Sequence, residues 1–104
     1  MPIQLPWSWN TPLTVANSPL TSPWLGVAIG GFTKIIPWFV FAGGTSVHSI
    51  EGSFDGINVD ADFAYGAPVS GTAFVILSPF VRWKTVQTVA DATKSKVYLD
   101  SLMQ

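Results

Sequence analysis

The chain has 104 residues, of which 48% are hydrophobic and 11% are charged, with a formal net charge of −1. This length fits one domain with one core, and the charged fraction is well below the average of about 25% for soluble domains. The 13% aromatic content excludes intrinsic disorder, the lack of cysteine excludes disulfide scaffolds, thiol catalysis and cysteine-ligated zinc, and the net charge provides no general attraction for nucleic acid.

The first 24 residues differ from the rest, because they hold five of the eight prolines and no charged residue. Each proline fixes its own φ and biases the preceding residue toward extended backbone, so we expect neither a helix nor a central strand. We therefore predict an extended proline-rich N-terminal arm (1–24) ahead of a single β domain (25–104), docked either on its own domain or on a neighbouring subunit. Its predicted anchors are the large apolar side chains of Ile3, Leu5, Trp7, Trp9, Leu13, Leu20 and Trp24.

Residues 25 onward have the pattern of β-strands. Strands are expected over 25–29, 35–42, 45–50, 59–65, 72–77 and 80–89, with Pro37 demanding a sheet edge or a bulge. Turn signals stand at Gly43-Gly44, at Asp55-Gly56 and around 66–68. Because breaks recur about every eight to twelve residues, we predict an all-β fold, a small antiparallel sandwich or barrel of jelly-roll-like type. Residues 96–103 fit a last strand or a short helix capped by Ser95.

Charge is segregated along the chain. One interpretation is two differently charged solvated faces of a single domain. The other is a contact between subunits, the acidic side of one against the basic side of the next, which sets their register. The acidic stretch comprises Glu51, Asp55, Asp60 and Asp62, and the basic stretch comprises Arg82, Lys84, Lys94 and Lys96.

No motif for catalysis is present. His48 is the only histidine, and strand geometry places it on the face opposite Ser49 and Glu51, so no nucleophile–base–carboxylate triad forms there. Asp55, Asn58, Asp60 and Asp62 offer oxygen ligands for a weak calcium site, but they lack EF-hand spacing, and a solvated acidic turn is the simpler interpretation. We expect no enzymatic activity, no metal and no cofactor.

Five tryptophans are the most unusual feature of the composition. In an extended chain Trp7 and Trp9 point the same way, which suits a pair of anchors in a partner's groove or a platform for stacking sugars. Trp38 and Trp83 lie in strand-like runs, so we expect them in the core.

Two apolar stretches, 24–44 and 63–81, are long enough to be compared with membrane spans. The first carries Lys34 and Pro37 near its middle, and the second is broken by glycines and prolines. Buried strands are the favoured interpretation of both.

Taken together, these patterns predict a non-enzymatic structural protein. We expect a subunit of a homo-oligomeric or lattice assembly, such as a virion capsid, decoration (cement) or other shell protein, whose arm clamps neighbouring subunits. Its expected partners are copies of itself and a larger shell protein, at the surface of a virion or other extracellular assembly. The alternatives are a carbohydrate-binding β-sandwich that uses Trp7, Trp9 or Trp24 as a platform, and a small membrane-embedded protein.

Overall fold

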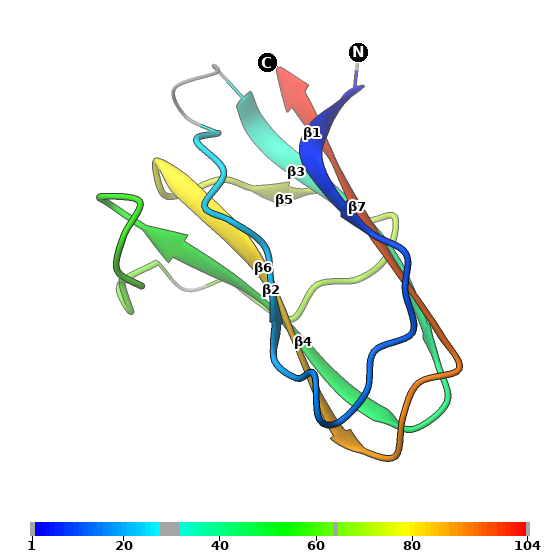
Figure 1. Cartoon of the computed structure of the whole chain (residues 1–104). Helices are drawn as coiled ribbons and strands as arrows, with labels where there is room; N and C mark the ends of the chain where they lie inside the picture. The colour runs from blue at the N-terminus through cyan, green and yellow to red at the C-terminus, as the bar shows by residue number, and fades with distance from the viewer. Residues whose placement is uncertain (1, 28–31, 64, 104) are drawn as a thin grey trace.

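The computed structural model describes residues 2–27, 32–63 and 65–103, which form two antiparallel β-sheets packed face to face (Figure 1). Sheet A has the strand order β1-β7-β3-β5, and sheet B has the order β2-β6-β4. The strands are β1 (Pro2–Trp9), β2 (Leu20–Thr21), β3 (Phe32–Ala42), β4 (Thr45–Ser53), β5 (Phe74–Val75), β6 (Phe80–Val89) and β7 (Lys94–Met103). The predicted all-β antiparallel sandwich is confirmed, and the C-terminal segment is a strand.

Consecutive strands always lie in different sheets. The odd-numbered strands build sheet A and the even-numbered strands build sheet B, so every connection crosses from one sheet to the other. Even the short turn at Gly43 and Gly44, both at positive φ, carries the chain from β3 in one sheet to β4 in the other. Every pairing in the sheets therefore joins strands that are not consecutive, a topology built on non-local contacts.

The separate N-terminal arm is not confirmed, because its residues are paired into the sandwich. Residues 2–9 form edge strand β1 against β7, with a register shift between Gln4 and Ser8, and residues 20–21 pair with β6. Between these strands, the Leu13 N–H donates to Ser95 Oγ (2.9 Å) and the Leu13 carbonyl accepts from the Ala92 N–H (2.9 Å). Prolines are tolerated at an edge strand and at irregularities, which is where Pro6 stands.

The predicted anchors of that arm lie mainly inside the molecule. Leu5, Leu13 and Leu20 are buried, and Trp7 and Trp9 pack against the core from β1. The side chain of Ile3 lies outside the described part of the chain. These apolar groups thus serve the fold of their own chain.

Three predicted strands are reduced or absent in the described part of the chain. In 25–29 only the Leu25 bridge to Val81 is seen, and residues 28–31 lie outside the described part. Residues 59–63 form a turn and no strand, and only 74–75 of 72–77 pair with β3. Because β5 ends there, Pro37 has no strand beside it on that side, and its carbonyl accepts from the Gly71 N–H (2.7 Å). The edge position that Pro37 requires is thereby provided.

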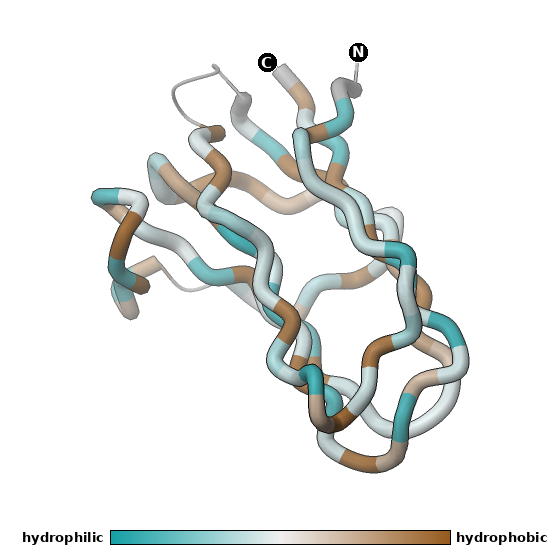
Figure 2. Tube along the Cα trace, in the orientation of Figure 1, coloured by the Kyte–Doolittle hydropathy of each residue, from teal (hydrophilic) through white to brown (hydrophobic). Residues whose placement is uncertain are grey.

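The core lies between the two sheets, centred on Trp83, whose side chain is fully buried. Strand β6 alternates strictly between buried and half-buried residues from Phe80 to Gln87, as its sequence predicts. The buried hydrophobic cluster comprises Leu5, Leu25, Val27, Ile35, Ile50, Val81, Trp83, Val97 and Leu99. In the tube of Figure 2 the hydrophobic residues are spread over both sheets, consistent with this shared core.

The buried side chain of Gln87 connects several segments at the end of the sandwich where β4 begins. The Gln87 amide donates to the Ala90 carbonyl (2.8 Å) and accepts from Ser46 Oγ (2.8 Å), and its backbone N–H donates to Ser18 Oγ (2.9 Å). Gln87 therefore ties the turn after β6 to β4 and to the segment before β2. In the described residues no helix is long and apolar enough to cross a membrane.

Candidate functional site

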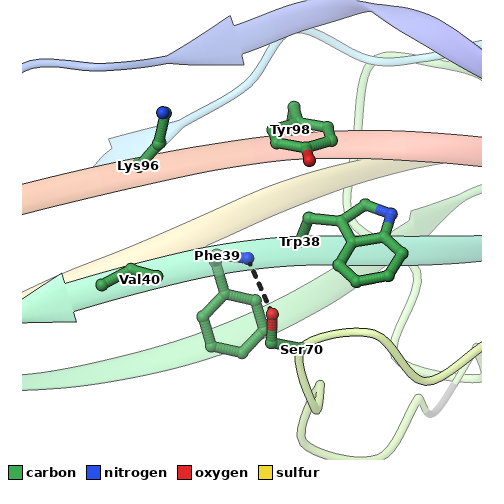
Figure 3. A pocket seen from close by; sticks show the side chains of 6 residues that line it. All are labelled: Trp38, Phe39, Val40, Ser70, Lys96 and Tyr98. Carbon is green, nitrogen blue, oxygen red and sulfur yellow. Dashed lines mark hydrogen bonds between the residues drawn. The ribbon is translucent and has the colours of Figure 1, made fainter.

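The outer face of sheet A exposes an aromatic surface (Figure 3). Trp38 and Val40 from β3 stand opposite Tyr98 and Lys96 from β7, which are their register partners. The exposed fractions are 38% for Trp38, 49% for Val40 and 36% for Tyr98. These four residues, with Ser70 from the loop before β5, are called the aromatic face below, and they surround a shallow pocket of about 210 Å³.

Contacts within the chain position the Trp38 ring and the loop that borders this face. The Trp38 and Tyr98 centroids are 6.5 Å apart with planes inclined by 25°. The Trp38 indole N–H donates to Asp100 (3.0 Å) on β7, and the Phe39 backbone N–H donates to Ser70 Oγ (3.0 Å), which brings the loop to the edge of the pocket. These contacts within the chain hold the Trp38 indole and the loop of Ser70 in position, and such preorganisation lowers the entropic cost of binding.

A second hollow, of about 300 Å³, continues this surface across Tyr98 toward β1. It adds polar groups to the aromatic ones. Its lining comprises Gln4, Ser8, Trp9, Asn10, Lys96, Val97 and Tyr98.

The predicted basic stretch is divided between the two outer faces of the sandwich. Lys94 and Lys96 are exposed on β7, beside the aromatic face, whereas Arg82 and Lys84 lie on the outer side of β6 in sheet B. Neither Lys94 nor Lys96 joins an ion pair among residues 2–27, 32–63 and 65–103. The cationic charge on sheet A is thus available to a partner.

On the outer face of sheet B, one pair of opposite charges is matched within the chain. Glu51 on β4 accepts from the Arg82 guanidinium (2.8 Å), and this guanidinium lies 4.5 Å from the centroid of the Trp24 ring. Glu51, Arg82 and Trp24, predicted as contacts to a partner, are here contacts of the chain with itself. Such a pair, with a cation over an indole, stabilises modestly.

An exposed apolar loop follows β4, at the end of the sandwich where β6 begins (Figure 1). Phe54, Ile57 and Val59 are 71%, 76% and 47% exposed. Residues 54–59 are called the apolar loop below. Exposure this high in three neighbouring large side chains is unusual for a surface that meets only water.

Asp55 fixes the shape of this loop. Its Oδ1 accepts from Ser53 Oγ (3.0 Å) and from the backbone N–H groups of Ile57 and Asn58 (2.9 Å each), and its Oδ2 accepts from the Asn58 amide (3.2 Å). The backbone bonds from Asn58 and Ile57, which stabilise the carboxylate, hold the pKa of Asp55 far below its usual range. Asp55 thus acts as the internal cap of the turn predicted at this position.

The other predicted acidic residues flank the loop. The Asp62 N–H donates to Asp60 Oδ1 (3.0 Å), and the Asp60 N–H donates to the Gly52 carbonyl (2.9 Å). No cluster of three or more His, Cys, Asp or Glu side chains able to hold a metal ion occurs in the described part of the chain, so the calcium interpretation has no support there. The carboxylates instead give the rim of the apolar loop a negative charge.

His48 lies between the sheets and is half-buried. Its ring centroid is 4.5 Å from that of Phe41 and 4.9 Å from that of Phe39, and its Nδ1 lies 3.0 Å from Thr85 Oγ1. Burial lowers the pKa of His48 below its ordinary value, which keeps the ring neutral at physiological pH. Its neighbours make it a packing residue.

The prediction that Trp38 lies in the core is wrong, because its side chain is exposed on sheet A, and Tyr98 is not among the residues singled out in the sequence. Residues 35–42 are apolar on both sides of the strand, so alternation does not show which side faces out. One signal was available: Lys34, Trp38 and Val40 share one side of the strand, because side chains two residues apart point the same way. An exposed lysine on that side marks it as the outer one.

No protein-family model matches this chain, and no curated protein or solved structure shows significant similarity to it.

Proposed function

We propose that this protein is a non-enzymatic structural subunit that associates with copies of itself in an oligomeric or lattice assembly. The shell or surface of a virion, where a larger shell protein is a second partner, is the setting that its composition suggests. The observation that carries the proposal is the presence of two ordered apolar surfaces, the aromatic face and the apolar loop, on a chain with few charges.

Several features support association. Large exposed apolar patches on a soluble chain mark interaction surfaces, and aromatic side chains dominate the binding energy of interfaces. Only 11% of the residues are charged, so a free monomer is weakly protected against association. The exposed large hydrophobic side chains are those of Val15, Trp38, Val40, Val47, Phe54, Ile57, Val59, Val69, Val75, Leu77, Val89 and Tyr98.

The experiment is light scattering behind size exclusion, on the full chain without detergent, over a hundredfold range of concentration. We expect the mass to rise with concentration above that of the 11.2 kDa monomer. A monomer at every concentration contradicts the proposal. Removing residues 1–24 is not a suitable test, because it deletes β1, β2 and buried Leu13.

Carbohydrate binding is a second candidate, favoured by the aromatic face itself. Neighbouring Trp and Tyr rings on a sheet, bordered by Gln4, Asn10 and Asp100, combine an apolar platform with hydrogen-bonding groups. The platform differs from the predicted one, because Trp7 and Trp9 pack against the core and Trp24 lies beneath Arg82.

This second candidate predicts a monomer whose tryptophan fluorescence changes on titration with a glycan. Trp38→Ser removes the change if the aromatic face is the site. Trp24→Ser is the matched control, since that indole lies on the other sheet. A glycan screen without any response rejects the candidate.

A further inference from the structure

The aromatic face and the apolar loop, two exposed apolar surfaces in the described part of the chain, have opposite charge. The apolar loop is bordered by Asp55, Asp60 and Asp62, and no lysine or arginine occurs between residues 52 and 81. The aromatic face includes Lys96, and Lys34 and Lys94 lie on the same outer side of sheet A, with Asp100 bonded to the Trp38 indole. Surfaces that combine apolar contact with opposite charge are complementary.

The surfaces also differ in shape. The loop offers three large side chains with most of their area in water, on a backbone that Asp55 holds in one conformation. The aromatic face has the opposite shape, a shallow pocket of about 210 Å³ that Trp38, Val40, Lys96 and Tyr98 help to line. Preorganisation on both sides lowers the conformational entropy lost when they meet.

One chain does not bring these surfaces together. The loop extends from the end of β4, in sheet B, and its Gly56 lies against the Phe80 ring. The aromatic face points away from sheet B, since Ile35 and Phe39, on the other side of β3, are the residues that pack in the core. A contact between loop and face therefore needs two copies of the chain.

We propose that the apolar loop of one copy docks on the aromatic face of the next, with Phe54 or Ile57 in the pocket and the aspartates toward the lysines. This inference rests on the proposed function and specifies its contact. When each copy gives its loop to one neighbour and its face to another, the contact is heterologous, and a pair of copies keeps one free loop and one free face. Repetition of it closes into a ring or extends as a filament.

The test uses two variants of the full chain, each lacking one half of the contact. The loop variant is F54S/I57S, and the face variant is V40S/K96E; V89S, which removes an exposed valine from the end of β6, is the matched control. All substituted side chains are on the surface, and circular dichroism checks the fold of each variant. Association is measured by sedimentation velocity for each protein alone and for a 1:1 mixture of the loop and face variants.

We expect each variant alone to associate at least about tenfold more weakly than the wild-type chain, while V89S is unchanged. The 1:1 mixture is expected to form a heterodimer and to stop there, because it contains one intact face and one intact loop. Added salt weakens that heterodimer, since the charges around the contact are exposed.

The outcomes separate this inference from the proposed function. If the wild-type chain associates and either variant associates as strongly, the contact is not heterologous and only this inference is overturned. If both variants lose association and their mixture stays monomeric, the inference is again overturned. If the wild-type chain is monomeric throughout, the proposed function fails as well.

The charge reversal K96E with D62K is an independent check. Each single reversal places like charges near one another and weakens association, and the double reversal in one chain restores attraction if these charges meet across the contact. A double variant weaker than both single variants contradicts the proposed orientation.

Discussion

Gln87 and Asp55 each organise a turn by bonding to several neighbouring groups, at opposite ends of sheet B, but their surroundings differ. Gln87 is buried, and its amide bonds to Ala90 and Ser46. Asp55 is exposed, and the turn that it caps holds apolar side chains in water. Side-chain hydrogen bonds thus contribute mainly to stability at one end and to the shape of a surface at the other, because only buried polar groups carry a large penalty when unpaired.

The largest effect is expected from Gln87→Leu. It removes the hydrogen bonds that the buried Gln87 amide makes to the Ala90 carbonyl and to the half-buried Ser46 hydroxyl, and each such bond contributes about 1–1.5 kcal/mol. We therefore expect the free energy of unfolding in urea to fall by about 2–3 kcal/mol. Gln4→Leu is the control: the Gln4 side chain is exposed on β1, so this substitution should change the free energy of unfolding little. If the two substitutions lower the free energy of unfolding equally, the hydrogen bonds of Gln87 do not stabilise this end of the sandwich.

The second largest loss of stability is expected from Gly44→Ala, at the same end of the sandwich. Gly44 has φ +67°, and a Cβ there meets the Gln87 amide and the Val89 carbonyl, and lies 2.7 Å from the Ala90 carbonyl. We expect a loss of about 2 kcal/mol or more in thermal or urea unfolding. Gly66→Ala has no atom within 4 Å of its Cβ, so it is the matched control, neutral or slightly stabilising.

Asp55→Asn is expected to act on association more than on stability. The folded-state pKa of Asp55 lies below the unfolded value of about 3.9, so its stabilisation is complete at neutral pH and is lost as the pH falls below about 4. The stability difference between wild type and D55N should therefore shrink between pH 6 and pH 2. In sedimentation at pH 7, D55N should associate more weakly while keeping its circular dichroism. A pH-independent difference would rule out the carboxylate as its source.

The smallest effect is expected from the Glu51–Arg82 pair on sheet B. A double-mutant cycle of Glu51→Gln and Arg82→Gln should give a coupling energy of about 0.5–1 kcal/mol in urea unfolding, since the pair is close to solvent. Neither change should alter association, because this pair belongs to the face that we expect no copy to cover. Weakened association in either variant would indicate that the contact between copies involves sheet B and would contradict the proposed contact.

The sequence by itself determined the fold class and several local features. Breaks at glycine and proline, with alternation over 80–89, are enough for an all-β sandwich, because strand length and side-chain period are local properties. The Asp55-Gly56 turn and the edge requirement of Pro37 are likewise local, and both are met in the structure.

Only the tertiary structure decided where the strands and side chains go. Nothing local tells β1 to pair with β7 about ninety residues later, so the N-terminal segment was expected as an arm and lies in sheet A as a strand. Likewise Trp38 could face either way, since both sides of β3 are apolar, and packing of Ile35 and Phe39 on sheet B turned it outward. Periodicity defines two faces of a strand, whereas which face is buried depends on the partners that the whole chain brings to it.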